Sequence, residues 1–406
     1  MRNTGLVIFL LILYILFGAS TTIIIKHLSF VESKGKKYDH DWFLNLLMFF
    51  SEMSGLPIFC FLNRKSKNDN DEENENENEN EEKDDLDVIS DKINKASNNK
   101  KISNSKKVLY TIIPFLFDNI ASFLSILSLD NLPGSIFMML KGLVVVAATF
   151  LLSKFSLKNK HIIDHYISII VSSIGFVFIG LSLALNRTET NKSASEIILG
   201  IAFIVIAMIL QSIQYILEEH YMNKYNISQF FFLGFEGLLG FIFNIILCII
   251  FYNIKCDTDS KFRNIFCSED GDGIWRVENI LFVFEQMGAN STILILNISL
   301  IFIIGGYNLF GISLVKYKGA VIRSLTVNMK TFLVWIYFMI PWVADNLREK
   351  FELFKLIGLI FIFMAILIYF GIFKIDEKVT IRRKLKELNE KDDSLIISRD
   401  SSINEQ

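Results

Sequence analysis

Cysteine and histidine are scarce in this chain, whose 406 residues include four of the former and five of the latter. No two cysteines have the spacing of a metal-ligand pair, and the histidines are scattered, so the sequence predicts neither a disulfide framework nor a metal site. A phosphate-binding glycine loop and a Gly-x-Ser-x-Gly nucleophile motif are also missing. We therefore expect no cofactor, no nucleic-acid partner, no coupling to nucleotide hydrolysis and no enzymatic activity.

Long apolar runs, by contrast, are abundant. Hydrophobic residues make up 52% of the chain, and the mean hydropathy is +0.42. A soluble protein would interleave these residues with polar ones on each helix, whereas here they form blocks of about 20 residues, which is the length that crosses a bilayer. The sequence predicts an all-α polytopic membrane protein with ten transmembrane helices. The expected spans are residues 6–25, 42–62, 108–127, 132–152, 164–185, 197–217, 229–252, 293–315, 320–339 and 354–373.

The first apolar run has two interpretations. Arg2, the apolar residues and the small residues Gly18, Ala19 and Ser20 also fit a cleaved secretory signal. Because the apolar character continues to Ile25, a retained helix is favoured.

The spans divide the chain into segments of different character. The segment between the second and third spans is acidic and rich in Asn, with too few apolar residues to order itself, and the C-terminal tail is similar. The predicted segments are helices one and two at 1–62, a disordered cytosolic insertion at 63–107, helices three to five at 108–185, a loop at 186–196, helices six and seven at 197–252, a non-cytosolic loop at 253–292, helices eight to ten at 293–373 and a disordered cytosolic tail at 374–406.

Orientation depends on the Lys and Arg residues near the span ends. They are modestly enriched on the side that carries the insertion and the tail, which predicts that both termini are cytosolic. Cys256 and Cys267 then share a non-cytosolic loop, where a disulfide and two free thiols both fit.

Two landmarks recur along the chain at nearly the same offset. The stretch FFSEMSGLP places Glu52 in the second span, and FLGFEGLLGF places Glu236 in the seventh, 184 positions later. The stretch LPGSIFMML opens the fourth helix at Gly134, and KGAVIRSL opens the ninth at Ala320, 186 positions later. This agreement indicates a five-plus-five inverted repeat, the architecture that many transporters use for alternating access.

Six ionisable residues lie well inside predicted spans, away from the span ends, although an ammonium group there costs about 2.5–3.5 kcal/mol on insertion scales. Arg323 and Lys330 are seven positions apart, which places them within about 20° on one face of a continuous α-helix. The repeat offset maps Lys141 onto Val327, between those two residues. We therefore expect the fourth and ninth helices to direct cations into a central water-filled cavity, with structural ion pairs as the alternative. The six residues are Glu52, Asp118, Lys141, Glu236, Arg323 and Lys330.

Further polar residues on the third, sixth and eighth spans fit the same cavity, although polar groups also bond between packed helices. The predicted solute-binding residues are Lys141, Arg323, Lys330, Asp118, Gln211, Gln214 and Asn308, and the predicted coupling or charge-balancing residues are Glu52 and Glu236. The fifth and tenth spans carry small residues and no central charge, so we expect them to brace the bundle or to form a homodimer contact.

Several motifs resemble one known family. The stretch SIFMMLKG at 135–142, the sequence Leu217-Glu218-Glu219, the stretch EGLLGF at 236–241 and the basic pair of the ninth span match the F branch of the nucleotide-sugar-transporter-like solute carriers, family 35, in the drug/metabolite transporter superfamily. The chain is similar, more distantly, to the chloroquine-resistance-type transporters. The resemblance implies a transporter whose cavity is lined by helices one to four and six to nine. Lys141 departs from the family's Arg and lacks the bidentate fork of a guanidinium group.

These observations predict a secondary carrier or exchanger of a small organic solute, anionic or zwitterionic, in an intracellular membrane of the vacuolar, lysosomal, Golgi, endoplasmic-reticulum or plastid type. Its partners would be the solute and membrane lipid. Two alternatives stay open: a proton-coupled exporter of cationic drugs or peptides, and a membrane scaffold without transport activity.

Overall fold

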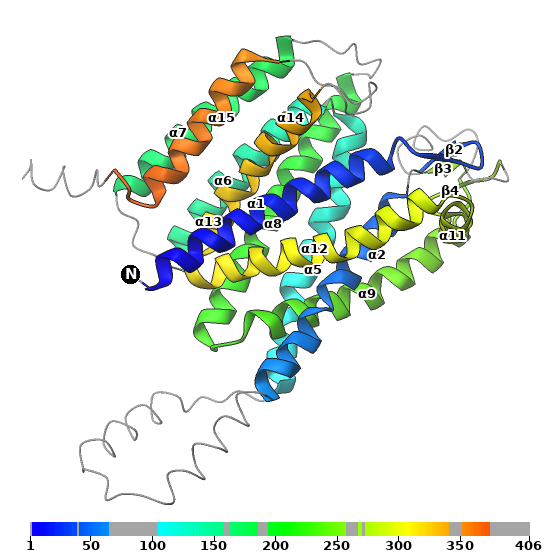
Figure 1. The fold of residues 1–406 in the computed structure, drawn as a ribbon, viewed down its shortest axis with the longest axis horizontal. Coiled ribbons are helices and arrows are strands. Elements are labelled where there is room, and N and C mark those ends of the chain that lie inside the picture. The colour runs from blue at the N-terminus through cyan, green and yellow to red at the C-terminus, as the bar shows by residue number, and fades with distance from the viewer. Residues whose placement is uncertain are drawn as a thin grey trace, which may run out of the picture.

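The computed structural model describes residues 2–38, 40–64, 104–132, 134–157, 163–185, 194–256, 267–269, 273–340 and 351–373. Within these ranges the chain is a bundle of long helices with two short β-hairpins at one end (Figure 1). Most of the predicted insertion (residues 65–103), most of the predicted loop at 186–196 (residues 186–193) and the predicted tail lie outside the described residues.

The long helices follow the apolar runs of the sequence. They are α1 (Arg2–Leu28), α2 (Asp41–Glu52), α5 (Asn104–Asn131), α6 (Gly134–Ser156), α7 (Ile163–Leu185), α8 (Ala194–Lys224), α9 (Gln229–Asn253), α12 (Ser291–Lys318) and α15 (Leu353–Tyr369). A turn after α2 leads into a further helical segment at residues 55–64. The ninth predicted span is interrupted, because α13 (Ala320–Thr326) is joined to α14 (Lys330–Met339) by the 3-10 turn η1 (Val327–Met329).

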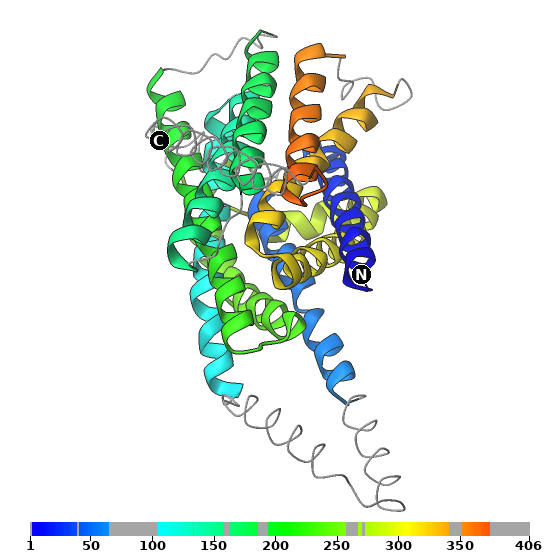
Figure 2. The same ribbon diagram turned by 90° about the vertical axis from the view of Figure 1, so that its left-hand side faces the viewer.

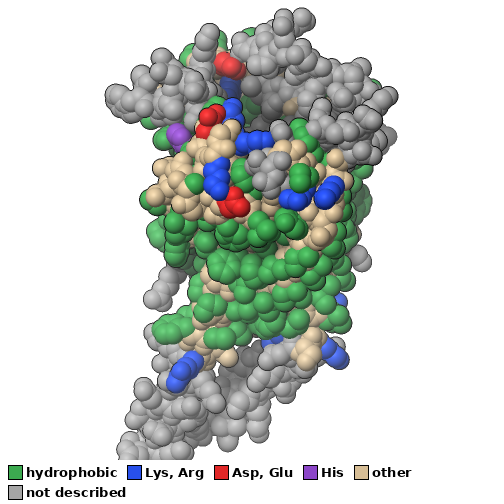
Figure 3. Space-filling model, turned by 90° about the vertical axis from the view of Figure 1, so that its right-hand side faces the viewer, with side chains coloured by type: hydrophobic (Ala, Val, Ile, Leu, Met, Phe, Trp, Pro, Cys, Tyr) green, Lys and Arg blue, Asp and Glu red, His purple; other side chains and the backbone are tan. Residues whose placement is uncertain are grey.

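Large apolar side chains face outward along much of the bundle. Phe302, for example, is 73% exposed and Ile170 is 61% exposed. Figure 3 shows these side chains as a broad belt, with charged groups above and below it. Seven helical stretches within the described residues are long and apolar enough to cross a membrane. The protein is an all-α polytopic membrane protein, as the composition predicts. The seven are Gly5–Leu28, Asp41–Arg64, Ser105–Ser128, Ile163–Ser182, Ile197–Lys224, Gln229–Asn253 and Ser291–Lys318.

Helices α7 and α15 form a close pair at one edge of the bundle (Figures 1 and 2). A Cβ added to Gly175 would lie 2.7 Å from the carbonyl oxygen of Gly358, and the Ser168 hydroxyl donates to the carbonyl of Ala365 at 2.7 Å. Small residues let the two backbones approach this closely. The small-residue faces of the fifth and tenth predicted spans are therefore turned toward each other. A homodimer through these helices stays a prediction, and it would have to use their outer, apolar faces.

Helices α2 and α9 also cross in close contact. A Cβ on Gly237 would lie 2.7 Å from the Cβ of Glu52, and one on Gly234 would lie 2.5 Å from the amide nitrogen of Leu56. The turn that ends α2 thus rests on the backbone of α9. This crossing places Glu52 and Glu236, the two glutamates of the predicted repeat, near each other.

A cap covers the end of the bundle at which α1 ends and α2 begins. It consists of the hairpin β1 (Glu32–Ser33) and β2 (Lys36–Lys37), the short helix α11 (Ile280–Ala289), and the hairpin β3 (Ser268–Glu269) and β4 (Trp275–Arg276). A disulfide joins Cys256 to Cys267 beside the second hairpin. The first helix is part of the bundle wall, since Val7, Leu10 and Tyr14 are buried and α1 packs against α12 and α14.

Candidate functional site

Arg323 of α13 has an ion-pair partner inside the bundle. Its Nη1 atom lies 2.6 Å from Oε2 of Glu218 on α8, and the two side chains are only 9% and 1% exposed. The guanidinium group also lies over the ring of Tyr215, 4.2 Å from its centroid. The second oxygen of Glu218 accepts a hydrogen bond from Nε2 of Gln214 at 2.9 Å. Glu218 is therefore bonded through both carboxylate oxygens, which suits an ionised group.

A chain of amide side chains continues from this pair. Gln214 Nε2 lies 3.2 Å from Oε1 of Glu236, and Gln211 Nε2 lies 3.3 Å from Oδ1 of Asp118 and 3.5 Å from Oε1 of Gln214. Helix α8 thus reaches carboxyl groups on α5 and α9 through Gln211 and Gln214, two of the predicted solute-binding residues. The arrangement brings together Asp118, Gln211, Gln214, Glu218 and Glu236 as one network.

Glu52 joins the network from the end of α2. Asn308 of α12 donates to its Oε1 atom at 2.6 Å, whereas its Oε2 atom is buried and has no hydrogen-bond partner among the described residues. Glu52, Asp118 and Glu236 lie within electrostatic range of one another, and none has a direct ion pair in the described part of the chain. Each is bonded to an amide, which can donate to a carboxylate or to the carbonyl oxygen of a protonated carboxyl group. Such a cluster can take up and release protons.

Lys141 of α6 and Lys330 of α14 form the second part of the site. Both are half-buried inside the bundle. The Lys141 ammonium lies 5.5 Å from the ring centroid of Phe137, and that of Lys330 lies 4.9 Å from the ring centroid of Tyr307. Neither has an ion-pair or hydrogen-bond partner among the residues that the structure describes, and Lys330 is near enough to repel Lys141 electrostatically. Cation–π contacts are worth roughly 0.5–2 kcal/mol each, so the two charges still need an anion.

Two tyrosines line the space between Arg323 and Lys330. The rings of Tyr14 and Tyr307 stack with centroids 4.7 Å apart, and the Tyr14 hydroxyl donates to that of Tyr307 at 3.1 Å. A Cβ on Gly311 would lie 2.8 Å from Tyr14 and 3.1 Å from Nε of Arg323, so glycine is required for this approach. Sequence reasoning missed this pair, although a phenol hydroxyl in an apolar span was an available signal.

The 3-10 turn η1 changes the geometry expected for the ninth span. A continuous α-helix would hold Arg323 and Lys330 on one face, but each residue of 3-10 helix turns the chain by about 20° more than α-helix does. Arg323 faces Glu218 on α8, whereas Lys330 faces Tyr307 on α12. The structure therefore separates two cations that the sequence pattern grouped together. Glu218, which completes the pair with Arg323, is absent from the set of predicted site residues.

The nine predicted site residues thus fall into two groups. One group contains Lys141 and Lys330, and the other contains Glu52, Asp118, Gln211, Gln214, Glu236, Asn308 and Arg323. Within the described residues, no cluster of three or more His, Cys, Asp or Glu side chains has an arrangement that could hold a metal ion.

Comparisons with known proteins agree with this architecture. The sequence profile of Solute carrier family 35 (SLC35F) matches residues 93–261. Solute carrier family 35 member F6 from Homo sapiens is 26% identical over 260 residues, which are 64% of this chain and 66% of that protein; the Rattus norvegicus protein is equally similar over 65% of its length. The match therefore spans just under two thirds of these relatives. A protein of known crystal structure superposes with a TM-score of 0.50 at 11% identity, over 90% of this chain and 97% of the other, which concerns the fold alone.

The fold is that of a multi-pass integral membrane protein, and the matches show that the chain is similar to solute carriers. The resemblance found in the sequence is confirmed, because the matching profile and the similar curated proteins are both of the SLC35F type.

Proposed function

We propose that the protein is a secondary carrier or exchanger with ten membrane-crossing elements arranged as a five-plus-five inverted repeat. The ten elements would be α1, α2 with residues 55–64, α5, α6, α7, α8, α9, α12, α13 with α14, and α15. Two features support the repeat. Glu52 and Glu236 meet where α2 crosses α9, and the repeat offset relates α6, which carries Lys141, to the segment that carries Arg323 and Lys330. In such carriers the two halves rock about a site near the membrane midplane.

The solute is an anionic or zwitterionic organic molecule, and Lys141 and Lys330 hold its negative group. The observation that carries this proposal is that both ammonium groups lie inside the bundle without an anionic partner among the described residues. Arg323 is held by its ion pair with Glu218 and contributes to the electrostatic potential at the site without binding the solute directly. The carboxyl groups of Glu52 and Glu236 balance charge or carry a proton.

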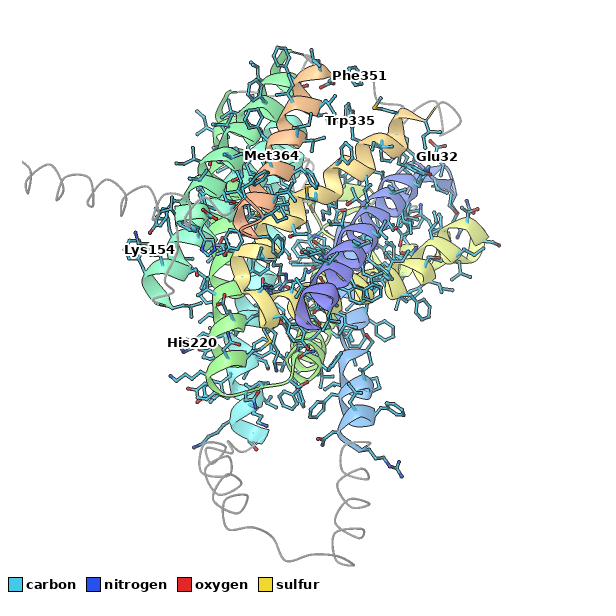
Figure 4. The ribbon with its side chains drawn as sticks, turned by 60° about the vertical axis from the view of Figure 1, so that its left-hand side comes forward. Glu32, Lys154, His220, Trp335, Phe351 and Met364 are labelled. Carbon is cyan, nitrogen blue, oxygen red and sulfur yellow. A yellow bond between two sulfur atoms is a disulfide. The ribbon has the colours of Figure 1, made fainter. Side chains whose placement is uncertain are left out.

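Reconstitution into liposomes tests the proposal. Purified protein should show saturable uptake of at least one anionic or zwitterionic metabolite from a panel that also contains cations. Lys141→Met and Lys330→Met should each reduce uptake roughly 10- to 100-fold, since a lost charged contact is worth about 1.5–3 kcal/mol. Lys154→Met is the matched control, because Lys154 lies exposed at the far end of α6 (Figure 4) and should leave uptake unchanged. The absence of saturable flux for any solute would favour the scaffold alternative.

A second candidate function rests on the carboxyl groups. Glu52, Asp118 and Glu236 have no direct ion pair in the described residues, as a proton-coupled exporter of cations would require. In that case Glu52→Gln would abolish cation uptake, whereas Lys141→Met would not.

The membrane and the orientation are also proposals. We place the protein in an intracellular organelle membrane with both termini in the cytosol, so that the cap and its disulfide face the opposite compartment, where disulfides form readily. Similarity to the solute carrier family 35 relatives supports the proposal that this protein transports a solute.

A further inference from the structure

His40 lies buried in the cap, far along α2 from the carboxyl groups of the solute site. It precedes α2 directly and is only 4% exposed. Its Nδ1 atom lies 2.7 Å from Oε1 of Glu278, and its Nε2 atom lies 3.1 Å from Oε1 of Gln286 on α11. Both nitrogen atoms of the ring therefore face an oxygen atom.

The amide of Gln286 can adopt only one orientation here. Its Nε2 atom donates to the backbone carbonyl oxygens of Ser33 at 3.1 Å and Lys36 at 3.4 Å, both in the β1–β2 hairpin. A flipped amide would bring its oxygen against these two carbonyl oxygens, so Oε1 must point at His40. The Glu278 oxygen that faces His40 also accepts the backbone N–H of Asn279 at 2.9 Å. This Glu278 oxygen therefore accepts hydrogen bonds from both the His40 ring and the backbone of Asn279.

A neutral imidazole has one N–H donor and one acceptor nitrogen, whereas the imidazolium ion has two donors. Only the imidazolium ion satisfies both contacts of His40. We propose that His40, Glu278 and Gln286 form a proton-binding site, separate from the solute site, that holds the cap closed while the proton is bound. The proposal does not rest on the transport function.

The surrounding groups are consistent with one titrating centre. Tyr38, whose ring centroid lies 5.0 Å from that of His40, donates to Asn297 of α12, and burial raises the pKa of its phenol, so it stays neutral. Phe282 of α11 and Cys248 of α9 lie on other sides of the cluster. Asp41 follows His40 at the start of α2. A salt bridge between Lys34 and Glu285, at 2.7 Å, lies on the exposed side of the hairpin and α11.

Proton loss would act on three elements at once, because the cluster ties the hairpin after α1, the start of α2 and the helix before α12. Deprotonation leaves one ring nitrogen of His40 with a lone pair in place of its hydrogen. This nitrogen then faces an oxygen atom to which it cannot donate, so at least one hydrogen bond is lost. The closed cap therefore binds the proton more tightly than the open cap does. Because proton binding at His40 and closure of the cap are linked, the closed cap is favoured at pH values below the pKa of His40. The closed cap becomes less stable as the pH rises through that pKa.

Hydrogen–deuterium exchange of the full-length protein in lipid nanodiscs tests this inference. After correction for intrinsic exchange, opening of residues 32–41 and 278–289 should increase roughly ten- to thirtyfold between about pH 5.5 and about pH 8, the upper figure being the limit for one proton and an open-state histidine pKa of about 6.5. His40→Gln should remove this pH dependence. His27→Gln should keep it, because the His27 Nε2 atom contacts a tyrosine hydroxyl, that of Tyr337 at 3.0 Å, which can donate or accept. Equal opening of the native cap at both pH values would overturn the proposal.

A second readout does not depend on whether the variants fold. Nitrogen NMR of the histidine-labelled native protein should show, among five histidines, one with both ring nitrogens protonated at neutral pH. Its signal should disappear in His40→Gln wherever that variant folds. Only neutral tautomers at neutral pH would contradict the assignment.

Discussion

Removing the charge of Glu218, the ion-pair partner of Arg323, should cause a large loss of folding stability. Glu218→Gln keeps an oxygen that can accept from Gln214 but removes the charge opposite Arg323. At the observed 2.6 Å, two unit charges attract by about 6 kcal/mol with an effective dielectric constant of about 20. Desolvation offsets part of this attraction, and breaking a buried pair typically costs about 3–5 kcal/mol because the remaining charge is left unpaired. We expect a destabilisation of this size.

Thermal unfolding in nanodiscs, followed with a thiol-reactive dye, measures the effect. Cys248 is only 2% exposed and reports unfolding, and Cys60 is exposed and would be changed to Ser in every variant. The unfolding midpoint of Glu218→Gln should fall by several degrees or more. The double variant Glu218→Gln, Arg323→Gln should recover most of the loss, since it leaves no charge unpaired. A neutral single variant, or a double variant that is no more stable than the single one, would refute the reasoning.

Three further predictions concern other parts of the chain. Gly175→Ala should cost about 1–3 kcal/mol, because its Cβ would lie 2.7 Å from a carbonyl oxygen of α15, whereas Gly288→Ala, with open space around it, should not destabilise the protein in the same assay. Thiol labelling of the denatured, unreduced protein should modify two of the four cysteines and reach all four only after reduction of Cys256–Cys267; four labelled thiols without reduction would contradict the disulfide. Glu52→Gln should make solute flux insensitive to an imposed pH gradient that drives the native protein, and an unchanged response would exclude Glu52 as the proton carrier.

The sequence carried much of the information about the fold and the general position of the site. Apolar blocks of membrane-spanning length predicted the helices, and the high cost of charge in hydrocarbon predicted that residues such as Lys141 and Glu236 face the interior. The sequence offset also predicts that α6 corresponds to α13 and α14, and this correspondence stays a prediction. These inferences depend on length, periodicity and solvation, which are local properties of the chain.

The choice of partners could not be predicted in this way. Arg323 pairs with Glu218 and not with Glu52 or Glu236 because of the crossing of α8 with α13 and the rotation introduced by η1. No proline or glycine marks η1 in the sequence, so its interruption of the ninth span has no local signal. The cluster at His40 depends on the β1–β2 hairpin and α11 meeting across more than 200 residues of chain. Contacts of this kind are set by tertiary packing.

Ligand-dependent stability of the two-lysine site tests the central claim most directly. At a hundred times its dissociation constant, a bound solute stabilises the folded form by about 2.7 kcal/mol. We predict that anionic or zwitterionic metabolites raise the unfolding midpoint of the native protein and of Lys154→Met. The double variant Lys141→Met, Lys330→Met should be at least as stable without solute, since it lacks two unpaired charges, but should show no such rise. A double variant that still responds to anions, or a native protein that responds only to cations, would contradict the proposed solute site.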